Sequence, residues 1–185
     1  MEVKEKLLDG GIGILPTDTL YGIVGKAELP MTVERIYEVR KRDLDKPFIV
    51  LIAFIDDLQK FNINIDADTR KILERVWPGK VSVVLPCPDE RFEYLHRGTK
   101  TIAFRVPNKE DLHELLREVG PLVAPSANIQ GFPPAETLEQ AKRYFGDDVD
   151  FYVEGDLPDN VPSPLIKIEN GKAIVLRGSM PLDLI

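Results

Sequence analysis

The sequence has few of the residues that form disulfides and metal sites. Among its 185 residues are one cysteine, Cys87, and two histidines, His96 and His113. A single cysteine excludes a disulfide within the chain and is typical of a reducing compartment. Neither histidine has His, Cys or Asp partners at the spacing of metal ligands, so we predict no metal site. Cys87 stands between two prolines, and we expect it to be structural.

Long apolar runs and familiar nucleotide-binding motifs are also missing. No stretch approaches the roughly 20 apolar residues that span a bilayer. Residues 1–6 carry charges of both signs, unlike a secretory signal, so we expect a cytoplasmic protein without membrane contact. The chain contains no Gly-x-x-x-x-Gly-Lys-Ser/Thr loop, no Gly-x-Gly-x-x-Gly and no Gly-x-Ser-x-Gly turn. Any nucleotide must therefore be held by a different arrangement.

The composition is that of an ordinary globular protein, with 43% hydrophobic and 30% charged residues. Its length predicts one domain, residues 1–185. The net charge of −7 is unevenly distributed. Residues 35–109 hold 15 Lys and Arg against 11 Asp and Glu, whereas residues 110–160 hold 3 against 12. A basic first half suits an anionic small molecule better than broad nucleic-acid binding. Charges scattered over solvated surfaces are an equally good explanation.

Apolar periodicity and capping signals predict alternating helices and strands. We expect helices at 3–9, 32–40, 56–61, 68–77, 109–119 and 137–146, and strands at 12–15, 48–52, 81–85, 101–106, 122–124, 151–153, 165–168 and 173–176. Asn108 and Thr137 are the expected N-caps. Residues 16–25 and 86–100 are expected to be loops, with Gly22 and Gly25 allowing a sharp turn or close ligand approach. Several neighbouring strands lack a helix between them, which predicts a mixed sheet.

Polar side chains follow the first strand, where Pro16 should end it. Thr17, Asp18 and Thr19 would then lie at the carboxyl end of a strand, where open α/β sheets bind ligands. An ordinary polar turn explains them equally well.

Three further clusters combine hydroxyls, amides and cations of the kind that hold phosphates and carboxylates. They are Thr101 with Arg105, Ser126 with Asn128, and Arg40-Lys41-Arg42 with Lys46. Taken singly, the basic run could be a solvated helix end, and Ser126 and Asn128 could cap a loop.

Five motifs occur in a fixed order along the chain: Pro16-Thr17-Asp18-Thr19-Leu20-Tyr21-Gly22, Arg40-Lys41-Arg42 with Asp45-Lys46-Pro47, Trp77-Pro78-Gly79, Ile102-Ala103-Phe104-Arg105-Val106-Pro107, and Pro125-Ser126-Ala127-Asn128 with Gly131. Each motif alone is weak. Together, over residues 12 to 177, they resemble the YrdC/TsaC family of threonylcarbamoyl-AMP synthases in its short, single-domain form. The resemblance implies an α/β fold, a YrdC-like twisted mixed β-sheet flanked by helices, with a concave basic ligand cleft.

This family joins L-threonine, bicarbonate or CO₂ and ATP to give threonylcarbamoyl-AMP and pyrophosphate. The product feeds the modification of adenosine 37 in tRNA through downstream tRNA threonylcarbamoyl-transferase proteins. The resemblance thus implies a nucleotidyltransferase with ATP as substrate and with Mg²⁺. L-Threonine would contact Thr19, Arg105 and Ser163. ATP would contact Arg40, Arg42, Lys46, Thr101, Ser126, Asn128 and Arg177, with Arg42 and Lys46 as catalytic residues.

The chain departs from the family pattern in two places. The family usually has Lys-x-Arg where this chain has Arg40-Lys41-Arg42, and its C-terminal motifs differ from Ser163-Pro164 and Arg177-Gly178. Two other functions stay open. One is a module that binds double-stranded RNA or tRNA without catalysis, and a weak tRNA contact is compatible with either function. The other is the carbamoyl-adenylate domain of hydrogenase maturation proteins, whose additional regions we do not expect in this chain.

Overall fold

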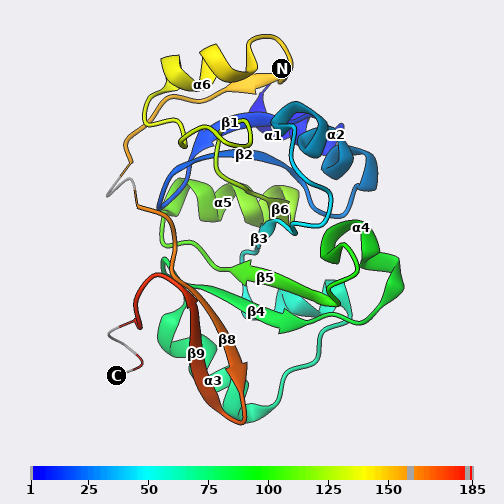
Figure 1. The fold of residues 1–185 in the computed structure, drawn as a ribbon, viewed down its shortest axis with the longest axis vertical. Coiled ribbons are helices and arrows are strands. Elements are labelled where there is room, and N and C mark those ends of the chain that lie inside the picture. The colour runs from blue at the N-terminus through cyan, green and yellow to red at the C-terminus, as the bar shows by residue number, and fades with distance from the viewer. Residues whose placement is uncertain (1, 158–160, 182–183, 185) are drawn as a thin grey trace.

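The computed structural model describes residues 2–157, 161–181 and 184. These residues form a nine-stranded mixed sheet with helices on both faces, in the strand order β7-β1-β2-β6-β3-β5-β4-β8-β9 (Figure 1). The strands are β1 Gly13–Pro16, β2 Tyr21–Lys26, β3 Ile49–Leu51, β4 Ser82–Pro86, β5 Thr101–Arg105, β6 Leu122–Val123, β7 Phe151–Tyr152, β8 Leu165–Glu169 and β9 Lys172–Arg177. The helices are α1 Val3–Leu8, α2 Pro30–Arg40, α3 Ala67–Val76, α4 Glu93–His96, α5 Glu110–Val119 and α6 Leu138–Phe145, with 3₁₀ helices η1 Ile55–Phe61 and η2 Glu90–Phe92. The predicted mixed sheet is confirmed, since β3 pairs in parallel with β5 and antiparallel with β6.

Alternating strand residues supply two hydrophobic cores, one on each face of the sheet. Ile14 of β1 and Ile23 of β2 belong to the larger core, while their neighbours Leu15 and Val24 belong to the smaller one. Successive strand side chains point to opposite faces, so strands buried on both faces appear as the continuous apolar runs seen in the sequence. Helix α2 contributes to the larger core and helices α1 and α5 to the smaller.

The expected loop over residues 16–25 was wrong in part. Residues 17–20 do form a turn after Pro16, but residues 21–26 form β2, which pairs antiparallel with β1. Gly25 lies near the end of this strand, paired with Val123. A Cβ added there would stand 2.5 Å from Cγ2 of Thr32 on α2, so the glycine permits close helix–strand packing. It serves neither a sharp turn nor a ligand.

Two further expectations needed correction. The connection 86–100 contains η2 and α4, whose side chains Tyr94, Leu95 and His96 pack inward. The N-cap of α5 is Lys109, not Asn108, and no side chain caps it. Thr137 does cap α6, accepting from the backbone N–H of Gln140 at 3.2 Å. Cys87 is fully buried, in keeping with a structural role, and burial raises the pKa of its thiol.

No helix within the described ranges is long and apolar enough to cross a membrane.

Candidate functional site

A pocket of about 190 Å³ lies where five stretches of the chain meet. The turn between β1 and β2, the segment from the end of α2 to the start of β3, the end of β5, the loop after β6 and residues from around β8 and β9 contribute to its walls. Its lining residues are Thr17, Thr19, Leu20, Tyr21, Gly22, Arg40, Arg42, Pro47, Phe48, Ile49, Arg105, Ala124, Pro125, Ser126, Pro134, Pro162, Ser163 and Arg177. Four arginines and no acidic residue are therefore among the described residues of the lining.

The turn between β1 and β2 is held by Thr17. Its hydroxyl donates to the carbonyl of Leu20 at 2.7 Å and accepts from the backbone N–H groups of Thr19 and Leu20, both at 3.2 Å. The hydroxyls of Thr17 and Thr19 are 3.1 Å apart. These bonds satisfy the backbone locally, as short polar side chains in turns commonly do. They hold Thr19 at the pocket wall.

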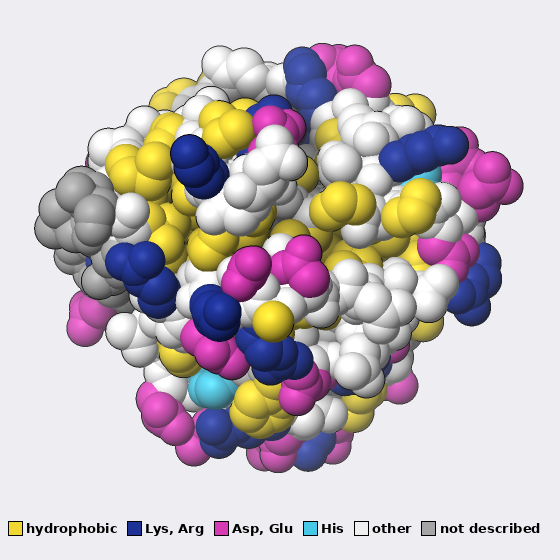
Figure 2. All heavy atoms as spheres, turned by 90° about the horizontal axis from the view of Figure 1, so that it is seen from below, with side chains coloured by type: hydrophobic (Ala, Val, Ile, Leu, Met, Phe, Trp, Pro, Cys, Tyr) yellow, Lys and Arg dark blue, Asp and Glu magenta, His cyan; other side chains and the backbone are white. Residues whose placement is uncertain are grey.

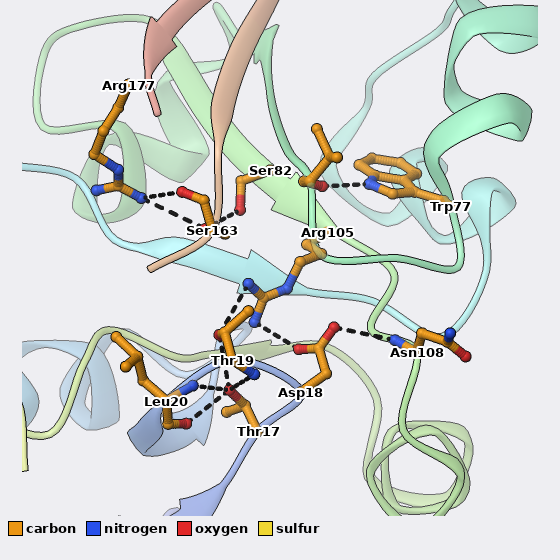
Figure 3. Close-up of polar contacts among 11 residues, drawn as sticks. Thr17, Asp18, Thr19, Leu20, Trp77, Ser82, Arg105, Asn108, Ser163 and Arg177 are labelled. Carbon is orange, nitrogen blue, oxygen red and sulfur yellow. Dashed lines mark hydrogen bonds and ion pairs between the residues drawn. The ribbon is translucent and has the colours of Figure 1, made fainter. Parts of the chain in front are cut away.

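A buried ion pair stands beside this turn. Nη2 of Arg105 lies 3.0 Å from Oδ1 of Asp18, and Nη1 donates to the hydroxyl of Thr19 at 3.3 Å (Figure 3). Oδ2 of Asp18 accepts from the backbone N–H of Asn108 at 3.1 Å. Both side chains are almost completely buried. Burial lowers the pKa of Arg105, while Asp18 acts in the opposite direction.

Arg40, at the end of α2, is a second buried arginine. Its Nε donates to the carbonyl of Asn128 and its Nη2 to Oδ1 of Asn128, both at 3.0 Å. The hydroxyl of Ser126 donates to the same Oδ1 at 2.7 Å. Nη1 is buried and has no hydrogen-bond partner among the described residues. Burial, together with neighbouring Arg42, lowers the pKa of Arg40 to about 9, so its guanidinium is charged at neutral pH.

Arg42 and Lys46 lie on the loop between α2 and β3. Nε of Arg42 is 3.5 Å from the carbonyl of Lys46, which also accepts from the Tyr37 hydroxyl at 3.0 Å. Tyr37 stacks on Phe48 with 3.9 Å between ring centroids, and Phe48 lines the pocket. The guanidinium of Arg42 lies 5.8 Å from the Phe48 centroid. The loop thus presents Arg42 to the pocket, while the ammonium of Lys46 pairs with Asp43.

Ser163 and Arg177 close the pocket from the β8–β9 side. Nη2 of Arg177 donates to the carbonyl of Ser163 at 3.0 Å, and the hydroxyls of Ser163 and Ser82 are 3.0 Å apart (Figure 3). Partial burial and Arg42 lower the pKa of Arg177.

The structure brings most of the expected site residues to this pocket, but not all. Thr19, Arg40, Arg42, Arg105, Ser126, Ser163 and Arg177 line it. Asn128 lies behind Arg40 and Ser126, and Lys46 is half exposed beside Asp43. Thr101 lies at the other end of β5, about 13 Å from Arg105 at the rise of an extended strand, and its hydroxyl donates to Thr99. The geometry therefore does not support a direct ATP contact by Thr101.

Two polar residues that support the site were assigned no substrate contact from the sequence. Asp18 belongs to the first motif, but an aspartate in a turn normally indicates a solvent-exposed position. Ser82 is a fully buried hydroxyl in β4. A serine within the apolar run Val81–Leu85 was a signal for it, because a buried polar group needs a partner.

The described residues contain no group of three or more His, Cys, Asp or Glu side chains that could hold a metal ion. The lining offers hydroxyls and arginines, whereas Mg²⁺ prefers carboxylate, phosphate and water oxygens. These residues therefore do not fit a metal held by the protein alone. A magnesium ion here would need oxygen ligands from a bound substrate.

The sequence matches one family model over almost its whole length. The Sua5/YciO/YrdC model, described as "Telomere recombination", covers residues 5–179. The threonylcarbamoyl-AMP synthase of Nitrosococcus oceani is 34% identical over 147 residues, which cover 79% of this chain and 80% of that protein. The threonylcarbamoyl-AMP synthase of Bacillus subtilis is 35% identical over 135 residues, which cover 72% of this chain and 39% of that protein.

A solved structure shares the fold. Pyrococcus abyssi Sua5 complexed with L-threonine matches with a TM-score of 0.86 at 28% identity, over 94% of this chain and 52% of that chain. This chain thus spans about half or less of the Pyrococcus and Bacillus proteins, and most of the Nitrosococcus protein.

Proposed function

Because the chain belongs to the Sua5/YciO/YrdC family, we propose that it is a threonylcarbamoyl-AMP synthase. The reaction would join L-threonine, bicarbonate or CO₂ and ATP, and release pyrophosphate. One observation carries the proposal. A single pocket combines an arginine paired with a carboxylate, beside a threonine hydroxyl, with three arginines that have no ion pair among the described residues.

The amino-acid end of the pocket would be formed by Thr19, Arg105 and Ser163. An arginine N–H and two hydroxyls can hold a carboxylate and a small polar side chain. The Pyrococcus relative named for its complex with L-threonine supports this choice of ligand.

The nucleotide end would be formed by Arg40, Arg42, Ser126 and Arg177. Nη1 of Arg40 supports a phosphate contact there, because a buried donor without a partner is costly until a ligand accepts from it. The volume of 190 Å³ is below the 300 Å³ or so at which pockets for drug-sized ligands begin. ATP would therefore extend across the open mouth. Mg²⁺ would be held by the phosphates of ATP and would offset their charge.

The chemistry needs little proton transfer by side chains. The threonine amine would combine with bicarbonate to give an N-carboxylate and water. An oxygen of this carboxylate would attack the α-phosphorus of ATP, and the bond from that phosphorus to the bridging oxygen of the β-phosphate would break. Fixed arginines would hold the anions together and stabilise the charge of the leaving pyrophosphate. Asn128 would act indirectly by holding Arg40 and Ser126.

The decisive experiment uses purified protein with ATP, bicarbonate and labelled threonine. We expect a short-lived labelled nucleotide adduct and an equal amount of pyrophosphate, both dependent on threonine. ATP hydrolysis without a threonine adduct would contradict the proposal. We further propose that the product passes to tRNA-modifying proteins and that this takes place in the cytoplasm. A chain with a single cysteine is typical of a reducing compartment, which supports the proposed location.

The RNA-binding alternative has a separate outcome in the same system. Strong affinity for RNA with a steep salt dependence, persisting without ATP and threonine, would favour it. On the face drawn in Figure 2, Lys and Arg side chains are interspersed with Asp and Glu side chains. Such mixing weakens the attraction of that face for a polyanion.

A further inference from the structure

The four arginines of the pocket differ in their electrostatic surroundings. Arg40, Arg42 and Arg177 form no ion pair within the part of the chain that the structure describes, whereas Arg105 is paired with Asp18 at 3.0 Å. Asp18 is 0% exposed and Arg105 3% exposed. Water therefore screens this pair poorly, and the carboxylate largely cancels the charge of the guanidinium.

Asp18 lies behind Arg105 as seen from the pocket. Arg105 and Thr19 line the pocket and Asp18 does not, although all three are in contact (Figure 3). The carboxylate itself is fixed on its other side by the backbone N–H of Asn108. Asp18 therefore cannot turn toward a ligand without losing that bond.

The contact between Asp18 and Arg105 is one of charge. Oδ1 of Asp18 lies 3.0 Å from Nη2 of Arg105 but accepts no hydrogen bond among the described residues. Nε of Arg105 is also buried without a partner there, and Nη1 donates to Thr19. A guanidinium without an acidic neighbour binds phosphate as readily as carboxylate.

We propose that Asp18 determines specificity by cancelling the charge of Arg105, so that this end of the pocket admits an amino-acid carboxylate and rejects phosphate. The inference rests on the proposed function and assigns a role to a residue that does not touch substrate. A zwitterion carries no net charge, so it loses little electrostatic attraction to the site when Arg105 is neutralised. A phosphate loses most of its attraction. Excluding the wrong ligand by removing its partner charge is a common route to specificity.

The consequence concerns two anionic ligands that share one pocket. ATP and pyrophosphate would be confined to the three arginines without acidic partners. The amino-acid end would remain open to threonine whether or not phosphates are bound. Neither substrate could block the other by binding first.

The test is competition between inorganic phosphate and L-threonine, measured by calorimetric titration of threonine at several phosphate concentrations. The variants are Asp18→Asn, which keeps the shape and an acceptor for the Asn108 N–H, and Asp68→Asn as a matched control. Asp68 is 75% exposed on α3 and pairs with Lys71. We expect millimolar phosphate to change the threonine Kd of wild type and D68N by less than about twofold. In D18N, the phosphate concentration that halves the affinity for threonine should be lower than in wild type by about tenfold or more.

Other outcomes separate the two proposals. Circular dichroism shows whether D18N is folded. If folded D18N binds threonine and phosphate affects its threonine Kd no more than in wild type, this inference is overturned and the proposed function is not. Wild type that binds no threonine overturns the proposed function, and this inference with it. If D18N does not fold, the same competition is measured with the wild-type protein alone. Inorganic phosphate that competes with ATP but not with threonine supports the proposed role of Asp18. Equal competition against both substrates overturns it.

Discussion

Arg42 combines exposure to the pocket with a charge that no described carboxylate neutralises. Its position on a loop, 3.5 Å from the carbonyl of Lys46, leaves the guanidinium free to follow a phosphate group. The fold does not depend on it, because the side chain is only partly buried.

Replacing Arg42 with alanine should therefore abolish most activity and leave the fold intact. A lost charge-assisted contact to the leaving group costs about 2–4 kcal/mol, which corresponds to an about thirtyfold to thousandfold lower rate of threonine-dependent pyrophosphate release. Arg75→Ala, at an exposed position on α3, is the control and should retain the wild-type rate. Wild-type pyrophosphate release by R42A would refute the assignment.

Arg40 gives the site a pH dependence. Its pKa is lowered to about 9 by burial and by Arg42. The free protein loses this charge as the pH rises through 9, whereas bound phosphate favours the protonated form. ATP affinity should hence be constant from neutral pH to about pH 8 and fall above pH 9.

The matching variant is Arg40→Gln, with ATP binding followed by calorimetry across that range. R40Q should bind ATP more weakly at every pH and lack the decline near pH 9. A decline of the same size in wild type and R40Q would mean that another group titrates.

Residue identities near the pocket were predictable to different degrees. Arg105 and Ser126 were found because motifs in a fixed order resemble a known family, although each residue has an ordinary structural explanation. Asp18 was expected at the ligand-binding end of the first strand, but its burial against Arg105 was not, because nothing local tells a buried turn aspartate from an exposed one. Thr101 was expected to contact ATP from the family resemblance alone, and only strand geometry shows that it lies at the opposite end of β5 from Arg105.

At the scale of elements, helix caps provide a direct test of local reasoning. Thr137 caps α6, while Asn108, which has a higher N-cap propensity, does not cap α5. The backbone N–H of Asn108 instead bonds to Asp18, and Lys109 takes the cap position. Helix α5 therefore begins one residue later than the local capping preference predicts.

Thr137→Ala should lower the free energy of unfolding by about 0.5–2 kcal/mol. Asn108→Ala keeps its backbone N–H and should change it by less than about 0.5 kcal/mol. Urea denaturation at equilibrium measures both, and the slope with urea should be unchanged. Equal destabilisation by the two substitutions would contradict the capping assignment.

Element prediction failed where packing, not pattern, decides the conformation. Residues 21–26 contain two glycines and no clear alternation, so nothing local marks β2 as a strand. It forms because β1 and β6 supply hydrogen-bond partners on both sides. Helix α4 has only four residues, too few for a periodic signal.

At the scale of the whole molecule, the mixed sheet was predictable and its strand order was not. Neighbouring strands without an intervening helix indicate some antiparallel pairing. The insertion of β6 between β2 and β3 depends on contacts distant in sequence, such as Gly25 with Val123. The two cores on opposite faces follow from the alternation of side chains along the strands, with α2 contributing to one core and α1 and α5 to the other.

The overall charge also predicts a weak affinity for tRNA. With a net charge of −7 and mixed charges on the face in Figure 2, the protein should bind tRNA no more tightly than the non-specific range of about 10⁻⁴–10⁻⁶ M at physiological salt. Fluorescence anisotropy with labelled tRNA at several salt concentrations, without ATP or threonine, tests this. Tighter binding that falls steeply with salt would revive the RNA-binding function.

Ser163 and Arg177 follow β7 in the chain, yet they complete a pocket whose other walls are made much earlier. During translation, Thr19, Arg42 and Arg105 leave the ribosome well before them. A nascent chain that stalls after β7 would hold an unfinished pocket, open where β8 and β9 should close it.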